Sequence, residues 1–149
     1  MANKPRDTTR PQHDYNDAHY GTLPIIAFPS GSDLAVLGIM IDNGGSAITT
    51  GTKADIPLFF NCNITGVEVL ANLSGGSIID IQTGTYGGFP TTSSITGLNK
   101  PTLNNQIKYL DQTLTSWSNT LNAGDVVRFI VNSSSTITRL TCALRLQRI

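Results

Sequence analysis

The C-terminal part of the chain alternates apolar and polar side chains with a period of two. Val127, Phe129 and Val131 share one side of residues 125–132. Residues 136–148 repeat the pattern, with leucine or cysteine at positions 140, 142, 144 and 146. A period of two places successive side chains on opposite faces of a β-strand, so each segment has one face for a core and one for solvent. Two strands are unstable alone, and the rest of the chain must therefore supply strands that cover them.

The polar run between these two segments predicts a turn. Asn132, Ser133, Ser134 and Ser135 have short side chains of the kind that bond back to their own backbone at turns. We therefore expect residues 125–148 to form a hairpin.

Further strands are expected upstream. Residues 34–41 are apolar on both faces, which is typical of a central strand or of a strand whose outer face meets a partner. Residues 67–73 and 79–81 flank Ser74-Gly75-Gly76, which predicts a second hairpin. Residues 106–117 have apolar residues at helical spacing but many poor helix formers, so we interpret them as strand.

This series of short strands, without a convincing helix, predicts the fold class. A length of 149 residues fits one domain. We expect an all-β antiparallel β-sandwich of the jelly-roll type over residues 34–149, preceded by an extended N-terminal arm over residues 1–33.

The arm differs from the body in composition. Residues 1–33 contain both histidines and several of the seven prolines, and they have neither a strand period nor a helix period. A disordered tail is one interpretation, but the aromatic and aliphatic content favours an arm that orders against another chain. An extended arm of this length reaches roughly 90 Å. The candidate partner-binding residues are Arg6, Arg10, Tyr15, Tyr20, Ile25 and Phe28.

Sparse, balanced charge argues against two classes of partner. Charged residues make up 13% of the chain and the formal net charge is zero, so no basic field attracts nucleic acid or an anionic membrane. We find no signal-peptide pattern and no apolar run that would cross a bilayer, and we expect synthesis in a cytosol. Cys62 and Cys142 fall at inward strand positions, where we expect two free thiols, with a disulfide as the alternative.

Catalytic and metal-binding patterns are weak. His13 and His19 both lie in the arm, and the two cysteines match no zinc-ligand spacing, so we expect no metal and no cofactor. The most serious enzyme alternative is a glycosidase that uses Glu68 and Asp80, which we expect on the outward faces of adjacent strands. Two lone carboxylates are more often solvated, and we expect a non-enzymatic protein.

A glycine-rich loop over residues 84–101 offers candidate glycan-binding aromatics. Sugar binding needs exposed aromatic faces with amide and hydroxyl groups around them. Tyr86 and Phe89 are the candidates, whereas we expect Trp117 to plug an end of the sandwich.

A series of short motifs occurs in a distinctive order from residue 45 onward. They are GSAITTGTKADIP at 45–57, ITGVEVLA at 64–71, SIIDI at 77–81, SITG at 94–97 and LNAGDV at 121–126. In this order they resemble a C-terminal β-sandwich domain of tailed-bacteriophage virion surface proteins, which occurs on head fibres, tail fibres and decoration proteins. The resemblance implies a β-sandwich and supplies no catalytic constellation.

The resemblance implies a structural role on the virion surface. A fibre needs a long shaft, and residues 1–33 contain neither heptads nor repeats. We therefore expect a capsid decoration, or cement, protein that is made in the host cytoplasm and whose arm contacts the major capsid protein, another virion protein or a neighbouring subunit. A homotrimer suits an icosahedral lattice. The alternative is a receptor-binding module of a tail or head fibre that binds a host glycan.

Overall fold

The computed structural model describes residues 33–149, which form an all-β antiparallel sandwich, as the alternation predicted. Its only helical element in that range is a short 3-10 turn, η1. The elements in chain order are β1 (Leu34–Asp42), β2 (Gly51–Pro57), β3 (Cys62–Thr85), η1 (Tyr86–Gly88), β4 (Ser93–Ser94), β5 (Thr102–Asp111), β6 (Thr120–Leu121), β7 (Asp125–Ser135) and β8 (Arg139–Arg148).

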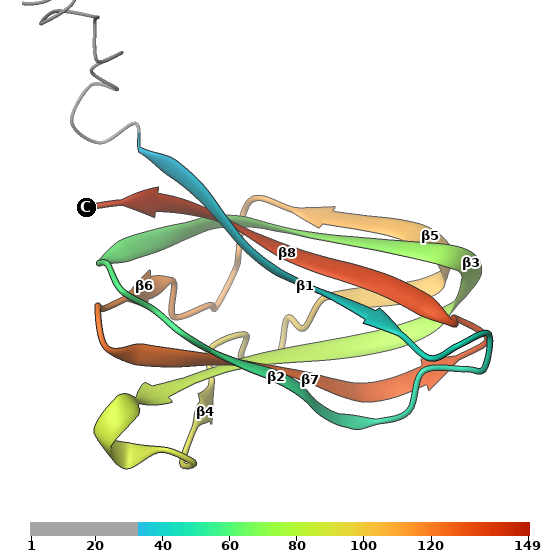
Figure 1. The fold of residues 1–149 in the computed structure, drawn as a ribbon. Coiled ribbons are helices and arrows are strands. Elements are labelled where there is room, and N and C mark those ends of the chain that lie inside the picture. The colour runs from blue at the N-terminus through green and yellow to red at the C-terminus, as the bar shows by residue number, and fades with distance from the viewer. Residues whose placement is uncertain (1–32) are drawn as a thin grey trace, which may run out of the picture.

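One long strand, β3, belongs to both layers of the sandwich (Figure 1). Its first half pairs with β8, where Val67 faces Leu144, and its second half pairs with β7, where Ile79 faces Val131. The first layer is therefore β1-β8-β3-β5 and the second is β2-β7-β3-β4. Because the same strand supplies a member to each layer, its bend connects them directly.

The pairing order is that of a jelly roll. The first strand pairs with the last, as β1 with β8, and the second pairs with the one before the last, as β2 with β7. This nested order wraps successive strands alternately into the two layers, which is how a jelly roll encloses its core. The fold class expected from the sequence is confirmed.

The expected hairpin around Ser74-Gly75-Gly76 is wrong, because the two halves of β3 pair with β8 and β7 rather than with each other. The strand does bend back at these residues, as expected, but it crosses into the other layer as it does so (Figure 1). The backbone of Gly75 packs against the connection between β7 and β8. A Cβ added at Gly75 would overlap the carbonyl oxygen of Ser135 and lie 2.9 Å from Cγ1 of Ile137. The glycine therefore permits a close approach of two backbones at the bend that takes β3 from one layer to the other.

The expected hairpin over residues 125–148 is also wrong. β7 continues through the serine run, and Ser133 and Ser134 stay paired with β3. The chain reverses at Thr136, whose φ of 70° is left-handed. β8 then enters the opposite layer and pairs with β1 and β3 instead of β7. Ser133 and Ser134 thus belong to β7, because their backbones pair with β3 instead of forming a turn.

The strand expected over residues 106–117 is correct as far as Asp111, where β5 ends. The Asp111 carboxylate accepts hydrogen bonds from the backbone N–H groups of Thr113 at 2.8 Å and Leu114 at 3.2 Å. The Thr113 hydroxyl, followed by these two amides, lowers the pKa of Asp111 and together they outweigh the opposing effect of burial. The carboxylate therefore ends the strand by capping a turn.

The alternating C-terminal residues form the core, as expected. Phe129 and Leu144 are fully buried, and the side chains around them come from both layers. Leu73 has the same phase as the buried Val67 and Val69, but it is 44% exposed because it lies at the bend of β3. The other fully buried apolar side chains include Ile64, Val67, Val69, Ile79, Ile81, Leu121, Val127, Ile137, Leu140 and Leu146.

Both cysteines are free and buried, as expected from their inward positions. Burial raises the pKa of the Cys142 thiol to about 12, and burial followed by the charge of Asp125 raises the pKa of Cys62. Both thiols are therefore protonated at neutral pH and pack as small apolar groups.

We predict that Gly75→Ala destabilises the sandwich by about 1–3 kcal/mol, because the added methyl group must push apart two backbones at the bend. Gly87→Ala is the matched control: nothing lies within 4 Å of a Cβ at Gly87. Urea unfolding of both variants measures the difference. Equal stabilities would contradict the close approach at Gly75.

Candidate functional site

The outer face of the second layer is covered by the protein's own loop. Asp55, Arg128 and Gln82 stand side by side on β2, β7 and β3. The Arg128 Nε donates to Asp55 at 2.6 Å, and its guanidinium also donates to the carbonyl oxygen of Pro90 at 3.1 Å and the hydroxyl of Thr92 at 3.2 Å. Arg128 therefore pins the segment after η1 onto the sheet.

A buried carboxylate, Asp80, anchors the rest of that loop. The side chain of Asp80 lies 2.8 Å from Lys100 Nζ and accepts hydrogen bonds from Ser94 at 2.6 Å, Thr96 at 2.8 Å and Gln82 at 3.0 Å. Burial raises the pKa of Asp80, but these donors, led by Lys100, outweigh it and hold the pKa below its usual value. Asp80 is an ionised carboxylate with its partners filled, which suits a structural role.

The expectation that Glu68 and Asp80 lie on adjacent strands is wrong, because both belong to β3, on opposite sides of its bend. Both side chains point away from the core, but from different layers, and Asp80 is buried under the loop. Glu68 instead forms an ion pair with Arg145 of β8. The two carboxylates therefore share no groove, and a glycosidase pair cannot be built from them.

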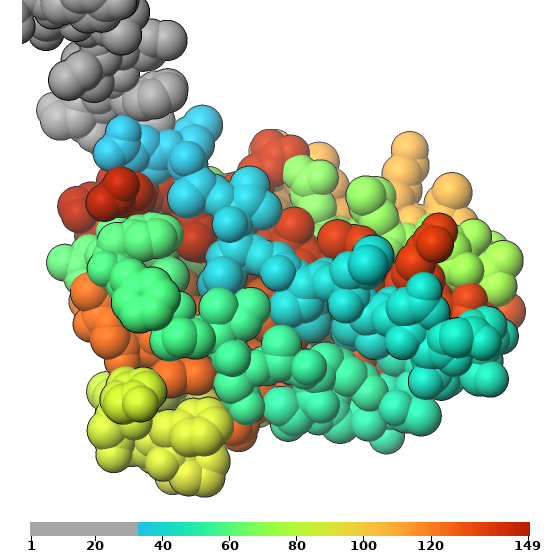
Figure 2. Space-filling view, in the orientation of Figure 1, coloured from blue at the N-terminus to red at the C-terminus, as the bar shows by residue number. Residues whose placement is uncertain are grey.

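The outer face of the first layer has no covering loop among residues 33–149, and it carries exposed apolar side chains beside the Glu68–Arg145 ion pair. Leu34, Val36 and Met40 of β1 are 77%, 74% and 70% exposed, and Leu70 of β3 and Leu110 of β5 are more than half exposed. Figure 2 shows β1, in blue, open along the surface. The segment that the sequence described as apolar on both faces is thus an edge strand with one face against the core and one face free. We call these five residues the apolar face.

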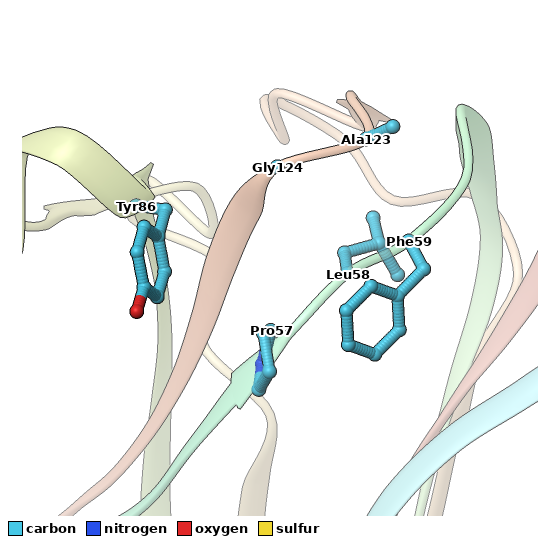
Figure 3. A pocket seen from close by; sticks show the side chains of 6 residues that line it. All are labelled: Pro57, Leu58, Phe59, Tyr86, Ala123 and Gly124. Carbon is cyan, nitrogen blue, oxygen red and sulfur yellow. The ribbon is translucent and has the colours of Figure 1, made fainter.

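A groove of about 730 Å³ opens at one end of the sandwich (Figure 3). The rings of Tyr86 and Phe59 stand on its two sides, and Pro57 lies between them. Backbone hydrogen bonds join its walls: Tyr86 N–H donates to Gly124 at 2.9 Å, and Gly124 N–H donates to Leu58 at 2.8 Å. We call it the aromatic groove; its lining residues are Pro57, Leu58, Phe59, Tyr86, Ala123 and Gly124.

The two glycan candidates from the sequence are separated. Tyr86 is 74% exposed and lines the aromatic groove. Phe89 lies outside the lining of that groove, with its ring 5.4 Å from the guanidinium carbon of Arg128. Trp117 packs against the core and donates its indole N–H to the Asn99 carbonyl at 2.9 Å, as expected of a plug.

Sequence reasoning missed Phe59, the second aromatic wall of the groove. Ile56, Leu58 and Phe60 alternate along the sequence, so Phe59 falls on the outward phase, and an outward phenylalanine was the signal that could have identified it. In the structure Phe59 is 83% exposed. The arm residues proposed for partner binding, from Arg6 to Phe28, lie outside the described residues. Within residues 33–149 no cluster of three metal-ligating side chains occurs, and no helix is long and apolar enough to span a membrane.

Comparison with known proteins gives no family. The sequence matches no protein-family profile and no curated protein. Solved structures with partial likeness include the complex of an Aeromonas sobria serine protease with its chaperone, with a TM-score of 0.33 and 10% identity over 78% of this chain and 27% of that one. Another is an infectious bursal disease virus structure, Gx strain, with a TM-score of 0.22 and 13% identity over 80% of this chain and 37% of that one. The chain thus spans well under half the length of either structure, and such low scores carry no functional argument.

We predict that Asp80→Asn lowers the free energy of unfolding by about 2–4 kcal/mol at pH 7, because Lys100 loses a buried ionic partner. The folded pKa of Asp80 is depressed below the ordinary value of 3.8, so its stabilisation is complete above that pH and is lost as the pH falls through the folded pKa. The difference between wild type and variant should therefore shrink in acid.

Urea unfolding from pH 7 down to pH 2.5 measures this difference. Glu68→Gln is the matched control, because it removes a solvent-exposed ion pair and should cost less than about 1 kcal/mol. A cost for Asp80→Asn that stays constant across the acid range would contradict a depressed pKa.

Proposed function

We propose that the protein is a non-enzymatic structural protein of a bacteriophage virion, a decoration protein bound to the outside of the capsid. The observation that carries the proposal is the exposed apolar strand β1, which continues directly into the arm. Leu34, Val36 and Met40 are all at least 70% exposed on one face of this strand, and clusters of exposed apolar side chains mark contact with another macromolecule.

The point where the arm joins the body supports this reading. The backbone N–H of Arg148 donates to the Asp33 carbonyl at 2.9 Å, which fixes the start of β1 at the edge of the first layer. The aromatic and aliphatic arm residues, Tyr15, Tyr20, Ile25 and Phe28, therefore precede an exposed apolar strand in one uninterrupted stretch of sequence. Arm and strand together offer a long contact strip.

The charged side chains of the sandwich also favour binding over catalysis. Asp80, Asp55 and Glu68 each face a cation of the same chain, Lys100, Arg128 or Arg145. A carboxylate used as a general acid or base needs a pKa near the working pH, whereas donors lower the pKa of Asp80. These groups stabilise the fold.

A decoration protein acts by mass action. A chain that binds the assembled shell but not free subunits stabilises the shell by the free energy of that binding. The proposed partners are the major capsid protein or another virion protein, reached through the arm residues from Arg6 to Phe28. The homotrimer expected from the sequence remains part of this proposal.

We predict that a variant lacking residues 1–32 keeps its unfolding midpoint but loses binding to purified capsids of the phage that carries it. The deletion leaves β1 and its Asp33 anchor intact, so the sandwich should fold. Co-sedimentation with capsids, together with circular dichroism of the free protein, measures both effects. If the variant bound capsids as tightly as the full chain, the arm hypothesis would be contradicted.

A second candidate function is binding of a host glycan in the aromatic groove. Two exposed rings on either side of a groove offer stacking surfaces for sugar rings. The backbone hydrogen bonds between its walls fix the positions of the segments that carry these rings. This role would suit a receptor-binding module of a tail or head fibre.

We predict that, if the groove binds sugar, Tyr86→Ala and Phe59→Ala each weaken glycan binding roughly threefold to tenfold, the loss of one stacking contact. Phe89→Ala is the matched control, because Phe89 lies outside the groove lining. Glycan-array binding followed by titration with the best sugar measures the effect. Equal losses for all three variants, or no binding by the wild type, would reject the groove as a glycan site.

A further inference from the structure

The sandwich has two free edges on the β1–β2 side, and they differ in how well they are protected. Among residues 33–149, β1 ends the first layer and β2 ends the second, so within that range each edge has a row of backbone groups without a strand partner. Such edges join other strands unless bulges, proline or charged side chains prevent it. The two edges can therefore be compared by these devices.

The β2 edge carries all three devices. Its pairing with β7 shifts register between Thr52 and Ala54, which is a bulge. Lys53 lies inside that bulge, and Pro57 ends the strand without a backbone donor. The β5 edge is similarly irregular, with two register shifts and a left-handed Asn105 at φ 53°. These edges are poor templates for another strand.

The β1 edge carries none of them. It pairs with β8 over nine consecutive positions without a register shift, so it is regular from end to end. Its sequence, LAVLGIMID, contains no proline and no cation, and its one charge is the terminal Asp42. The inward residues Ala35, Leu37 and Ile39 pack on the core yet remain partly exposed along this edge.

We propose that β1 pairs with β1 of a second copy of this chain, antiparallel and centred on Gly38. The sequence of β1 is nearly symmetric about that glycine. In an antiparallel pair centred there, Leu37 faces Ile39 and Val36 faces Met40 of the other copy, so apolar residues meet apolar residues on both faces. Asp42 faces Leu34, and no two like charges meet.

This pairing joins the first layers of two copies into one continuous sheet. The unpaired backbone groups of both edges become bonded, and the partly exposed inward residues of β1 become covered. The contact is the same on both copies, so it closes at two. The outer side of the joined sheet presents the apolar face twice. The inference does not depend on a capsid as the partner. It predicts a dimer in place of the homotrimer expected from the sequence, and the experiments below distinguish the two.

A cysteine pair tests the register in the full chain. Val36 and Met40 lie about 13 Å apart along one strand, too far for a disulfide within a copy. In the proposed pair they face each other across the axis. Val36→Cys/Met40→Cys should therefore give a disulfide-linked dimer on mild oxidation, whereas Val36→Cys alone should not. Leu98→Cys/Ile107→Cys, at exposed positions outside β1 and outside the apolar face, controls for random collision.

A charge swap tests the same contact without oxidation. Val36→Lys/Met40→Lys places lysine opposite lysine twice and should raise the dimer dissociation constant at least roughly tenfold by analytical ultracentrifugation. Val36→Lys/Met40→Glu carries equally polar side chains but places opposite charges together, and it should restore the dimer. Both positions are at least 70% exposed, so neither change touches the core.

The expected result is a wild-type dimer, a crosslink in the double-cysteine variant alone, and recovery by the lysine–glutamate pair. A monomeric wild type at tens of micromolar would overturn the proposal. So would a trimer that lacks the crosslink, or equal loss of assembly in both charge variants.

Discussion

The sandwich depends on the bend of a single strand. β3 supplies a member to each layer, and its bend brings Gly75 against the backbone of Ser135 at the point where β7 gives way to β8. The first half of β3 pairs with β8, which pairs with β1. The second half of β3 pairs with β7, which pairs with β2. A side chain at Gly75 would act on both layers at once, because the whole pairing order passes through this contact.

The two outer faces of the sandwich differ because only one of them has a covering segment. Asp80 and Arg128 bind the loop that follows η1 and so seal the second layer with the protein's own chain. Nothing comparable in residues 33–149 covers Val36, Met40 or Leu70 on the first layer. The outer face of the second layer is therefore covered within the same chain. The apolar face of the first layer is where contact with other molecules is most favourable.

The sequence predicted well what depends on burial and poorly what depends on which strands meet. Period-two alternation identified Phe129 and Leu144 as core residues, because side-chain direction follows directly from strand geometry. Gly75 and the serines at 133–135 were interpreted as hairpin turns, and this was wrong. Glycine and serine also occur at bends within strands and in paired strands, and only tertiary packing distinguishes these cases. For the site, Tyr86 was found as a loop aromatic, but Phe59 comes beside it through pairing that the sequence does not display.

The nested pairing of β1 with β8 also governs when the fold can form. The partner of β1 ends at Arg148, so during synthesis the ribosome must deliver nearly the whole body before the first strand can join its sheet. Contacts this distant in sequence close slowly. A nascent chain therefore carries an unpaired apolar β1 until β8 has left the ribosome, and chaperones that bind exposed apolar segments would have most effect on this protein before that point.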